Sequence, residues 1–427
     1  MKIVCSHERR FRTVLQQVRN RGVQSNSQVE KAVKGILQSV ARHGDAAVAR
    51  YSLKFDKVRL RPSAFRVHPD IVKEAHARIR KDEGDALRFA AERIRAFHER
   101  QRIATWMYQE RGARLGQLVT PLETVGIYVP GGKAVYPSSV LMNAIPAKVA
   151  GVKRVVMCTP TSTGDINPYL LVAADIAGVD EVYRVGGAQA IAAMAYGTQT
   201  IPGVDKIVGP GNRYVATAKR LVYGVVDIDM IAGPSELVVI ADESGSPSHV
   251  AADLLCEAEH DEEARVYLVT TSSELAQLVV QEIAKQLERL TRQKIAKKSI
   301  GRYAVAFVVP TLEEAFEVAN HIAPEHLEIM LERALDYIGH VRHAGAVFLG
   351  RYTPPAVADY VAGPNHVLPT GGTARFSSCL SFDDFVKKSN VVCYTKDELR
   401  TVRTQVKQLS QIEGLDAHGY SMESRWD

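Results

Sequence analysis

The sequence predicts an α/β fold with parallel sheets, and two observations carry this prediction. Short runs of β-branched residues end in Gly/Pro turns, and most of these turns lead into an Ala-rich helical stretch. Strand, turn and helix in that order are typical of βαβ units. The 427 residues are 46% hydrophobic and 24% charged, which is typical of globular chains, and the length suits two or three domains.

Residues 1–120 are predicted to be helical. The first long helix has an apolar stripe of helical period and a plausible stop at Gly44. The stripe comprises Val29, Val33, Ile36, Leu37 and Val40. Asp70 is a candidate cap for a second long helix that extends to Phe97. We expect no chemistry in this region.

Between residues 121 and 236, four predicted strands each lead into a glycine turn. These turns are Pro130-Gly131-Gly132, Gly186-Gly187-Ala188-Gln189, Gly209-Pro210-Gly211-Asn212 and Ala232-Gly233-Pro234-Ser235-Glu236. Ligands of open α/β sheets bind outside the carboxyl ends of the strands, and glycine permits close approach of the backbone. The turns therefore outline a binding crevice. The fingerprint G-x-G-x-x-G and the Walker motif are both absent, which disfavours an NTPase.

The remainder of the chain continues the alternation of strands and helices. Strands are predicted at residues 237–241, 266–270, 304–309 and 346–349, and helices near residues 246–260, 273–293 and 311–321. Residues 363–385 are rich in Gly, Ser and Thr and are predicted to form a loop. An amphipathic helix is expected from Asp397 onward.

Charge and cysteine content bound the partners and the compartment. The net charge of +6 divides into +14 for residues 1–120 and −8 for the rest. The basic third favours either solvated Arg-rich helix faces or, as a remote alternative, a nucleic-acid-binding protein. Five scattered cysteines, no secretory signal and no long apolar run predict a soluble, cytoplasmic protein without membrane contact.

Four places in the chain bring a carboxylate and an imidazole close together in sequence. They are Glu257 with His260, Glu325 with His326, Asp359 with His366, and Glu413 with His418. Positions three apart share a helix face, and Glu-x-x-His can hold a metal, although the same spacing is common in surface hydrogen bonds. Histidine is also the commonest general base. Oxygen and nitrogen ligands of this kind suit zinc.

Eight motifs, taken together and in order, resemble the histidinol dehydrogenase family. They are Val-Gly-Ile-Tyr-Val-Pro-Gly-Gly (125–132), Val-Gly-Gly-Ala-Gln-Ala-Ile (185–191), Gly-Pro-Gly-Asn (209–212), Ala-Gly-Pro-Ser-Glu (232–236), Ala-Glu-His (258–260), Pro-Glu-His-Leu (324–327), Gly-Pro-Asn-His-Val-Leu-Pro-Thr (363–370) and Glu-Gly-Leu-x-Ala-His (413–418). The resemblance runs from about residue 25 to residue 420.

The resemblance implies two Rossmann-like parallel-sheet domains that lack the usual GxGxxG, with small helical terminal segments. We expect an N-terminal segment at residues 1–25 and a larger α/β domain made of residues 26–126 and 237–372. A second α/β domain, residues 127–236, would carry the NAD-contacting turns. Residues 373–427 would form a C-terminal helical segment that is exchanged in a homodimer.

The resemblance also implies an activity and its residues. The family oxidises L-histidinol to L-histidine, the last step of histidine biosynthesis, through an aldehyde and with two NAD⁺. The zinc ligands would be Glu257, His260, Asp359 and His418. His326 would be the base for the alcohol proton, and Glu325 would activate water. Tyr128, Gln189 and Asn212 would contact NAD; the substrate contacts would be Ser235, Glu257, His260, His326, Asp359, Glu413 and His418.

One residue departs from the family pattern. Glu257 stands where the family normally has Gln. A carboxylate is the stronger ligand for a divalent cation, but it adds negative charge and removes an amide donor. This change leaves open a related enzyme that oxidises another primary alcohol. Its neighbour Cys256 raises a further alternative, a thiolate nucleophile that forms a thioester.

Overall fold

The computed structural model describes residues 1–22, 27–131, 135–161 and 164–426. It divides into two compact units. The first comprises Met1–Gln101 and Leu122–Phe385, and the second comprises Arg102–Pro121 and Val386–Asp427. None of the helices within the described ranges is both long enough and apolar enough to span a bilayer. Gly132, part of the first predicted turn, lies outside these residues.

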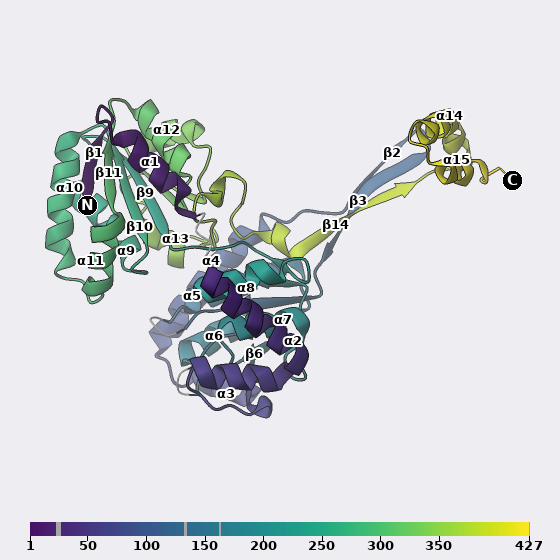
Figure 1. Cartoon of the computed structure of the whole chain (residues 1–427), viewed down its shortest axis with the longest axis horizontal. Coiled ribbons are helices and arrows are strands. Elements are labelled where there is room, and N and C mark those ends of the chain that lie inside the picture. Colours follow the sequence, from purple (N-terminus) through teal and green to yellow (C-terminus); the bar gives the residue numbers. More distant parts are fainter. Residues whose placement is uncertain (23–26, 132–134, 162–163, 427) are drawn as a thin grey trace. The chain divides into compact units, whose positions relative to one another are not determined.

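A six-stranded parallel sheet forms one half of the first unit, in the order β1-β11-β10-β9-β12-β13 (Figure 1). Its strands are β1 (Lys2–Cys5), β9 (Glu236–Ala241), β10 (Arg265–Thr270), β11 (Val305–Val308), β12 (His326–Met330) and β13 (Ala346–Leu349). Helices α9 (Pro247–Ala258), α10 (Ser273–Leu287) and α11 (Gln293–Tyr303) pack on one face. Helices α1 (Phe11–Arg19) and α12 (Leu312–Ile322) pack on the other. The apolar runs within β9 and β10, which follow Glu236 and Arg265, are explained by burial on both faces.

A five-stranded parallel sheet forms the other half, in the order β6-β5-β4-β7-β8. Its strands are β4 (Thr124–Tyr128), β5 (Arg154–Cys158), β6 (Glu181–Tyr183), β7 (Lys206–Val208) and β8 (Asp227–Ile228). The helices between these strands are α5 (Pro137–Ala150), α6 (Pro168–Ala177), α7 (Gly187–Tyr196) and α8 (Arg213–Val222). Two parallel sheets of α/β type confirm the predicted fold class.

The N-terminal helices pack on this second sheet's helices, which differs from the expected division of the chain. Helix α2 (Ser27–Phe55) contacts α7 and α8, while α3 (Pro69–His76) and α4 (Lys81–Glu99) contact α6 and α5. The predicted apolar stripe of α2 is buried in the same cluster as Ile191 and Val215. Residues 26–126 were expected to join residues 237–372, but this stripe has its apolar partners in the five-stranded half. The remaining limits of the division stay a prediction.

The second unit contains strands that the sequence pattern does not reveal. Antiparallel strands β2 (Trp106–Glu110), β3 (Ala113–Pro121) and β14 (Val386–Cys393) pair in the order β14-β3-β2, followed by α14 (Lys396–Ile412) and α15 (Asp416–Glu423). The expectation of helix through residue 120, and of a purely helical end, is therefore wrong. β2 is exposed throughout and β14 nearly so, so neither carries the apolar alternation that marks a strand.

Short elements complete the structure. Helix α13 spans Pro355–Tyr360, and short 3₁₀ helices lie at Asn20–Gly22, Pro62–Ala64, Ala334–His340, Thr373–Arg375 and Phe382–Phe385. The single long helix expected from Asp70 is two helices, α3 and α4, and the His68 side chain caps the first by accepting from the Asp70 N–H.

Candidate active site

The predicted acid–base pair, Glu325 and His326, lies at the amino end of β12, beside the amino end of β9. His326 is the first residue of β12 and pairs in register with Leu237 of β9. Glu325 precedes it, and Ser235 precedes β9 in the same way. Glu257 is supplied by the last turn of α9, which packs on β9. The expectation that all four glycine turns mark strand carboxyl ends is therefore wrong for residues 232–236, which lead into the amino end of β9.

His326 and Glu257 form a buried ion pair beside a second carboxylate. His326 Nδ1 lies 3.1 Å from Glu257 Oε2, and both side chains are less than a tenth exposed. The buried Glu325 accepts a hydrogen bond from the Glu236 N–H at 2.9 Å. Ligand atoms of Glu257, Glu325 and His326 all lie within 4.8 Å of one another, an arrangement that can hold a metal ion.

The electrostatics of this cluster favour a charged imidazole. Burial by itself would lower the pKa of His326, but the carboxylates of Glu257 and Glu325 outweigh burial and raise that pKa to about 10. The pKa of Glu257 is lowered, because the charge of His326 overcomes the effect of burial. Burial raises the pKa of Glu325 well above its ordinary value, and the nearby Glu257 carboxylate raises that pKa further.

Two further predicted metal ligands, His260 and Asp359, affect the charges of this cluster. His260 follows α9, and its N–H donates to the Glu257 carbonyl at 3.2 Å, while its charge helps to lower the pKa of Glu257. Asp359 of α13 is close enough to help raise the pKa of His326. His366 binds the Asp359 carbonyl through Nδ1 at 3.0 Å. The charges of His260 and Asp359 thus act on Glu257 and His326, whereas the ligand atoms that lie within 4.8 Å of one another are those of Glu257, Glu325 and His326.

Glu413 and His418 belong to the second unit. Glu413 ends α14 and His418 lies in α15, and both are exposed. The first unit therefore contains three of the four predicted metal ligands and five of the seven predicted substrate contacts.

The three predicted cofactor residues lie at the carboxyl end of the five-stranded sheet. Tyr128 ends β4, and its hydroxyl accepts from the Gly187 N–H at 3.0 Å. Asn212 caps α8, where its Oδ1 accepts from the Tyr214 N–H at 2.9 Å. Gln189, in the first turn of α7, is 1% exposed, and neither its Oε1 nor its Nε2 has a hydrogen-bond partner among the described residues. An unpartnered buried amide at this edge suits a polar ligand.

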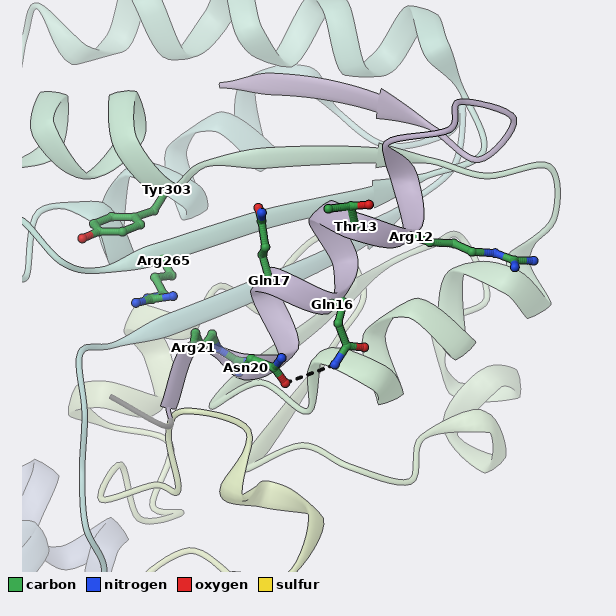
Figure 2. A pocket seen from close by; sticks show the side chains of 8 residues that line it. All are labelled: Arg12, Thr13, Gln16, Gln17, Asn20, Arg21, Arg265 and Tyr303. Atoms are coloured by element: carbon green, nitrogen blue, oxygen red, sulfur yellow. Dashed lines mark hydrogen bonds between the residues drawn. The ribbon is translucent and has the colours of Figure 1, made fainter. Parts of the chain in front are cut away.

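The sequence analysis missed a buried ion pair between Arg21 and Glu236, whose N–H donates to Glu325. The buried Arg21 pairs with Glu236 and donates to the Ile322 carbonyl at 2.9 Å. Glu236 Oε2 also accepts from the Gly371 N–H at 3.1 Å. Arg21 lines an open pocket of about 810 Å³ between α1, β10 and α11, with Arg12, Gln16, Arg265 and Tyr303 among its other residues (Figure 2). None of the predicted site residues lines this pocket.

The Cys256 thiol lacks the character of a nucleophile. Burial raises the pKa of Cys256 to about 12, and the carboxylates of Glu257 and Asp359 reinforce the rise. A thiolate is the reactive form, and it is strongly disfavoured here. The electrostatic surroundings of the thiol do not favour the thioester alternative.

Fold and site together define an α/β protein with a buried imidazole–carboxylate centre beside the six-stranded sheet and an unpartnered buried amide at the carboxyl end of the five-stranded sheet. The sequence model of the histidinol dehydrogenase family matches residues 19–426. Histidinol dehydrogenase from Bacillus thuringiensis subsp. konkukian is 50% identical over 427 residues, which cover 100% of this chain and 99% of the relative. The chain belongs to the histidinol dehydrogenase family, and it is an NAD-dependent oxidoreductase of histidine biosynthesis.

Two further comparisons agree with this membership. Histidinol dehydrogenase from Geobacter metallireducens is 52% identical over 407 residues, covering 95% of this chain and 93% of the relative. The crystal structure of histidinol dehydrogenase from Elizabethkingia anophelis matches with a TM-score of 0.94 and 35% identity, covering 100% of this chain and 98% of that one. The nucleic-acid alternative finds no support in these relatives.

Proposed function

We propose that this chain oxidises L-histidinol to L-histidine through the aldehyde, with two NAD⁺ as hydride acceptors and a zinc ion in the site. One observation carries the proposal: Glu325, His326 and Glu257 are buried together with their ligand atoms within 4.8 Å of one another. Membership of the histidinol dehydrogenase family supports the same chemistry.

His326 is the base of the alcohol step. As hydride leaves the carbinol carbon for NAD⁺, the hydroxyl proton moves to the imidazole. A base must be neutral before it accepts a proton, so His326 has to leave its ion pair with Glu257. Ligation of Glu257 to a metal ion is one way to withdraw that carboxylate.

Glu325 serves the aldehyde step. Its ionised carboxylate takes a proton from water as the water oxygen bonds to the aldehyde carbon, which gives the hydrated aldehyde. After His326 has released its first proton to bulk water, hydride leaves that carbon for the second NAD⁺ and a hydroxyl proton of the hydrate moves to the neutral imidazole. The raised pKa of Glu325 makes its carboxylate a stronger base than an exposed one.

The donor set of the site fits a divalent cation. Glu257, His260 and Asp359 of the first unit, together with His418 of the second, would supply two oxygen and two nitrogen ligands, which suits zinc. The ion would supply orientation, because it holds the imidazole and amino nitrogens of the substrate. Ser235 and Glu413 would contact the substrate, while Tyr128, Gln189 and Asn212 would contact NAD.

We further propose a homodimer that exchanges its terminal segments, so that Glu413 and His418 act in the site of the neighbouring subunit. Two features support this. The second unit is built from residues 102–121 and 386–427 and is compact in itself. Its two helices also carry exposed apolar side chains, Leu409, Ile412 and Tyr420, of the kind that subunit contacts cover. The five free cysteines support a reducing compartment, the cytoplasm.

The test is turnover of L-histidinol by purified, zinc-loaded protein. We expect two NADH for each histidinol consumed, loss of activity after chelation and recovery when zinc is restored. A fully loaded protein that forms no NADH from histidinol would refute the proposal.

Glu257 favours one competing function, the oxidation of another primary alcohol on the same scaffold. Comparing kcat/KM for histidinol with that for other polar primary alcohols decides between the two. The variant Glu257→Gln, which restores the family residue, reports whether this position sets the preference. We expect histidinol to remain the best substrate of both proteins.

A further inference from the structure

A further buried ion pair lies beside the proposed cofactor edge, outside the catalytic cluster. Lys219 of α8 and Asp229, just after β8, are about 2% and 1% exposed and bind each other. Removing two charges from water costs several kcal/mol each, so a buried ion pair is weak support for stability. The role of this pair is better judged from the other hydrogen bonds that its polar atoms make.

These polar atoms hold the peptide groups of one glycine. Lys219 Nζ donates to the Gly209 carbonyl at 2.8 Å, and Asp229 Oδ2 accepts from the Gly209 N–H at 2.7 Å. Asp229 Oδ1 accepts in addition from the Met230 N–H at 2.5 Å. Both backbone groups of Gly209 are thus fixed by one ion pair.

Gly209 is a position where the backbone needs such support. Its φ is +109°, a conformation that L side chains rarely adopt, and a Cβ there would collide with the Tyr128 carbonyl. Gly209 therefore lies directly against the end of β4. It also begins the turn that ends at Asn212, whose Oδ1 accepts hydrogen bonds from the N–H groups of Tyr214 and Val215 at the N-terminus of α8.

We propose that Lys219 and Asp229 are positioning residues for NAD. Their ion pair sets the Gly209 backbone, and through it fixes the turn from Gly209 to Asn212 against Tyr128 in the conformation that binds the cofactor. The proposal rests on the proposed cofactor contacts of Tyr128 and Asn212. Neither charged side chain needs to touch NAD, because each acts through Gly209.

The experiment compares Lys219→Gln and Asp229→Asn with a matched control. Lys206→Gln also removes a buried lysine, 7% exposed, which binds the Asp384 carbonyl at 2.8 Å and the Asp227 carboxylate at 3.0 Å. Lys206 lies at the opposite end of β7, the strand that leads into Gly209. Dissociation constants for NADH are measured by fluorescence titration, and KM is measured for NAD⁺ and for histidinol.

We expect Lys219→Gln and Asp229→Asn each to raise the NADH dissociation constant and the KM for NAD⁺ by about 10-fold, equivalent to about 1.4 kcal/mol. The KM for histidinol should change less than about 2-fold, and kcat at saturating NAD⁺ should fall less than KM rises. Lys206→Gln should leave NADH affinity within about 2-fold of wild type. Lys219→Arg should restore part of the affinity, because it keeps the charge and a donor.

Two outcomes overturn the proposal. In the first, folded Lys219→Gln and Asp229→Asn proteins bind NADH like wild type. In the second, Lys206→Gln loses as much affinity for NADH as these two variants do. Thermal unfolding curves identify the folded variants. If Lys219→Gln does not fold, the nearly isosteric Asp229→Asn and the conservative Lys219→Arg still decide. A wild-type protein that fails to bind NADH refutes the proposed cofactor site itself, a result distinct from any comparison among variants.

Discussion

The contact between Glu257 and His326 governs the residue-scale chemistry of this site. A carboxylate at position 257, unlike an amide, forms a charged partner for the imidazole at 3.1 Å. The same carboxylate is a proposed metal ligand. The one departure from the family pattern therefore bears on both the proton and the cation.

The variant Glu257→Gln should lower the pKa of His326 in the metal-free protein. In that protein the Glu257 carboxylate favours the imidazolium and helps to raise the pKa to about 10. An amide carries no charge, and burial would then act against the charged form. NMR titration of the His326 imidazole in wild type and variant measures the change. A His326 signal that titrates as in wild type would contradict this account.

His326→Ala and Glu325→Gln should damage different half-reactions. Because His326 accepts a proton in both oxidations, its loss should lower both rates at least about 100-fold. Glu325→Gln should impair the oxidation of histidinal by about 100-fold and the oxidation of histidinol to the aldehyde much less. Single-turnover rates with each substrate measure the two steps. Equal damage from Glu325→Gln in both would remove its assigned role.

The buried carboxyl groups of Glu328 and Asp253 should make the stability of the protein depend on pH. Burial, together with the facing Asp253 carboxylate, raises the pKa of Glu328 to about 9 from an ordinary 4.5, and burial raises that of Asp253 to about 6. The neutral form of Glu328 is thus favoured in the folded state, and its stability contribution, complete below pH 4.5, is lost as the pH rises through 9.

Glu328→Gln should therefore flatten the fall of the melting temperature between pH 5 and pH 9, since an amide does not ionise. Thermal unfolding across this range measures the effect. The exposed Glu332→Gln, just after the same strand, is the control and should follow wild type. A Glu328→Gln protein that loses stability with pH as steeply as wild type would argue against a protonated Glu328.

Motif residues of the candidate site could be predicted from the sequence, but their supporting contacts could not. Glu325 and His326 are adjacent in the chain, and Glu257 and His260 share one helix end, so local spacing suggests their proximity. Arg21 and Glu236 are 215 residues apart in the chain, and all five strands of the five-stranded half lie between them. No local pattern relates them, and only the packing of α1 beside β9 and α12 brings them together.

At the scale of elements, glycine interrupts the longest helix at a defined point. Gly44 in α2 has φ +49° and ψ −131°, and a Cβ there would collide with the Gln199 amide. The Gln199 Oε1 accepts from the Asp45 N–H at 2.9 Å, which secures the break. The predicted stop at Gly44 is thus a kink between two helical stretches.

Gly44→Ala should destabilise the protein by about 1–3 kcal/mol, because the backbone conformation there is strained for any residue with a Cβ. Gly35→Ala is the matched control in the same helix. Its Cβ meets no atom within 4 Å, so the substitution should stabilise by about 0.5–1 kcal/mol. Urea unfolding of both variants measures the difference, and a Gly44→Ala protein as stable as Gly35→Ala would show that the kink is not required.

Buried elements could be predicted from the sequence, and exposed ones could not. The apolar runs that became β4, β9 and β10 are buried on both faces and begin or end at turns, so composition alone indicates them. In β14 most residues are exposed, and its pairing with β3 rests on backbone hydrogen bonds that leave no pattern in the side chains.

At the scale of the whole molecule, the proposed exchange of termini allows a complementation test. In a mixed dimer of His326→Ala and His418→Ala subunits, exchange gives one site with both histidines intact. The purified mixed dimer should then have about half of wild-type activity, because one of its two sites is complete, and an unfractionated random assembly of equal amounts about a quarter. Co-expression with two affinity tags and assay of the purified mixed dimer measures this. An inactive mixed dimer would place His418 in the site of its own subunit.

The order of pairing in both units has a consequence for synthesis on the ribosome. Lys2–Cys5 pairs with Val305–Val308, and Ala113–Pro121 pairs with Val386–Cys393. The amino-terminal partner of each pair emerges long before its mate. The nascent chain thus exposes unpaired strand edges until residues 305–308 and 386–393 have emerged. Such edges are prone to aggregation, and contacts of such long range slow folding. A chain stalled before residue 386 would have a hairpin without its third strand.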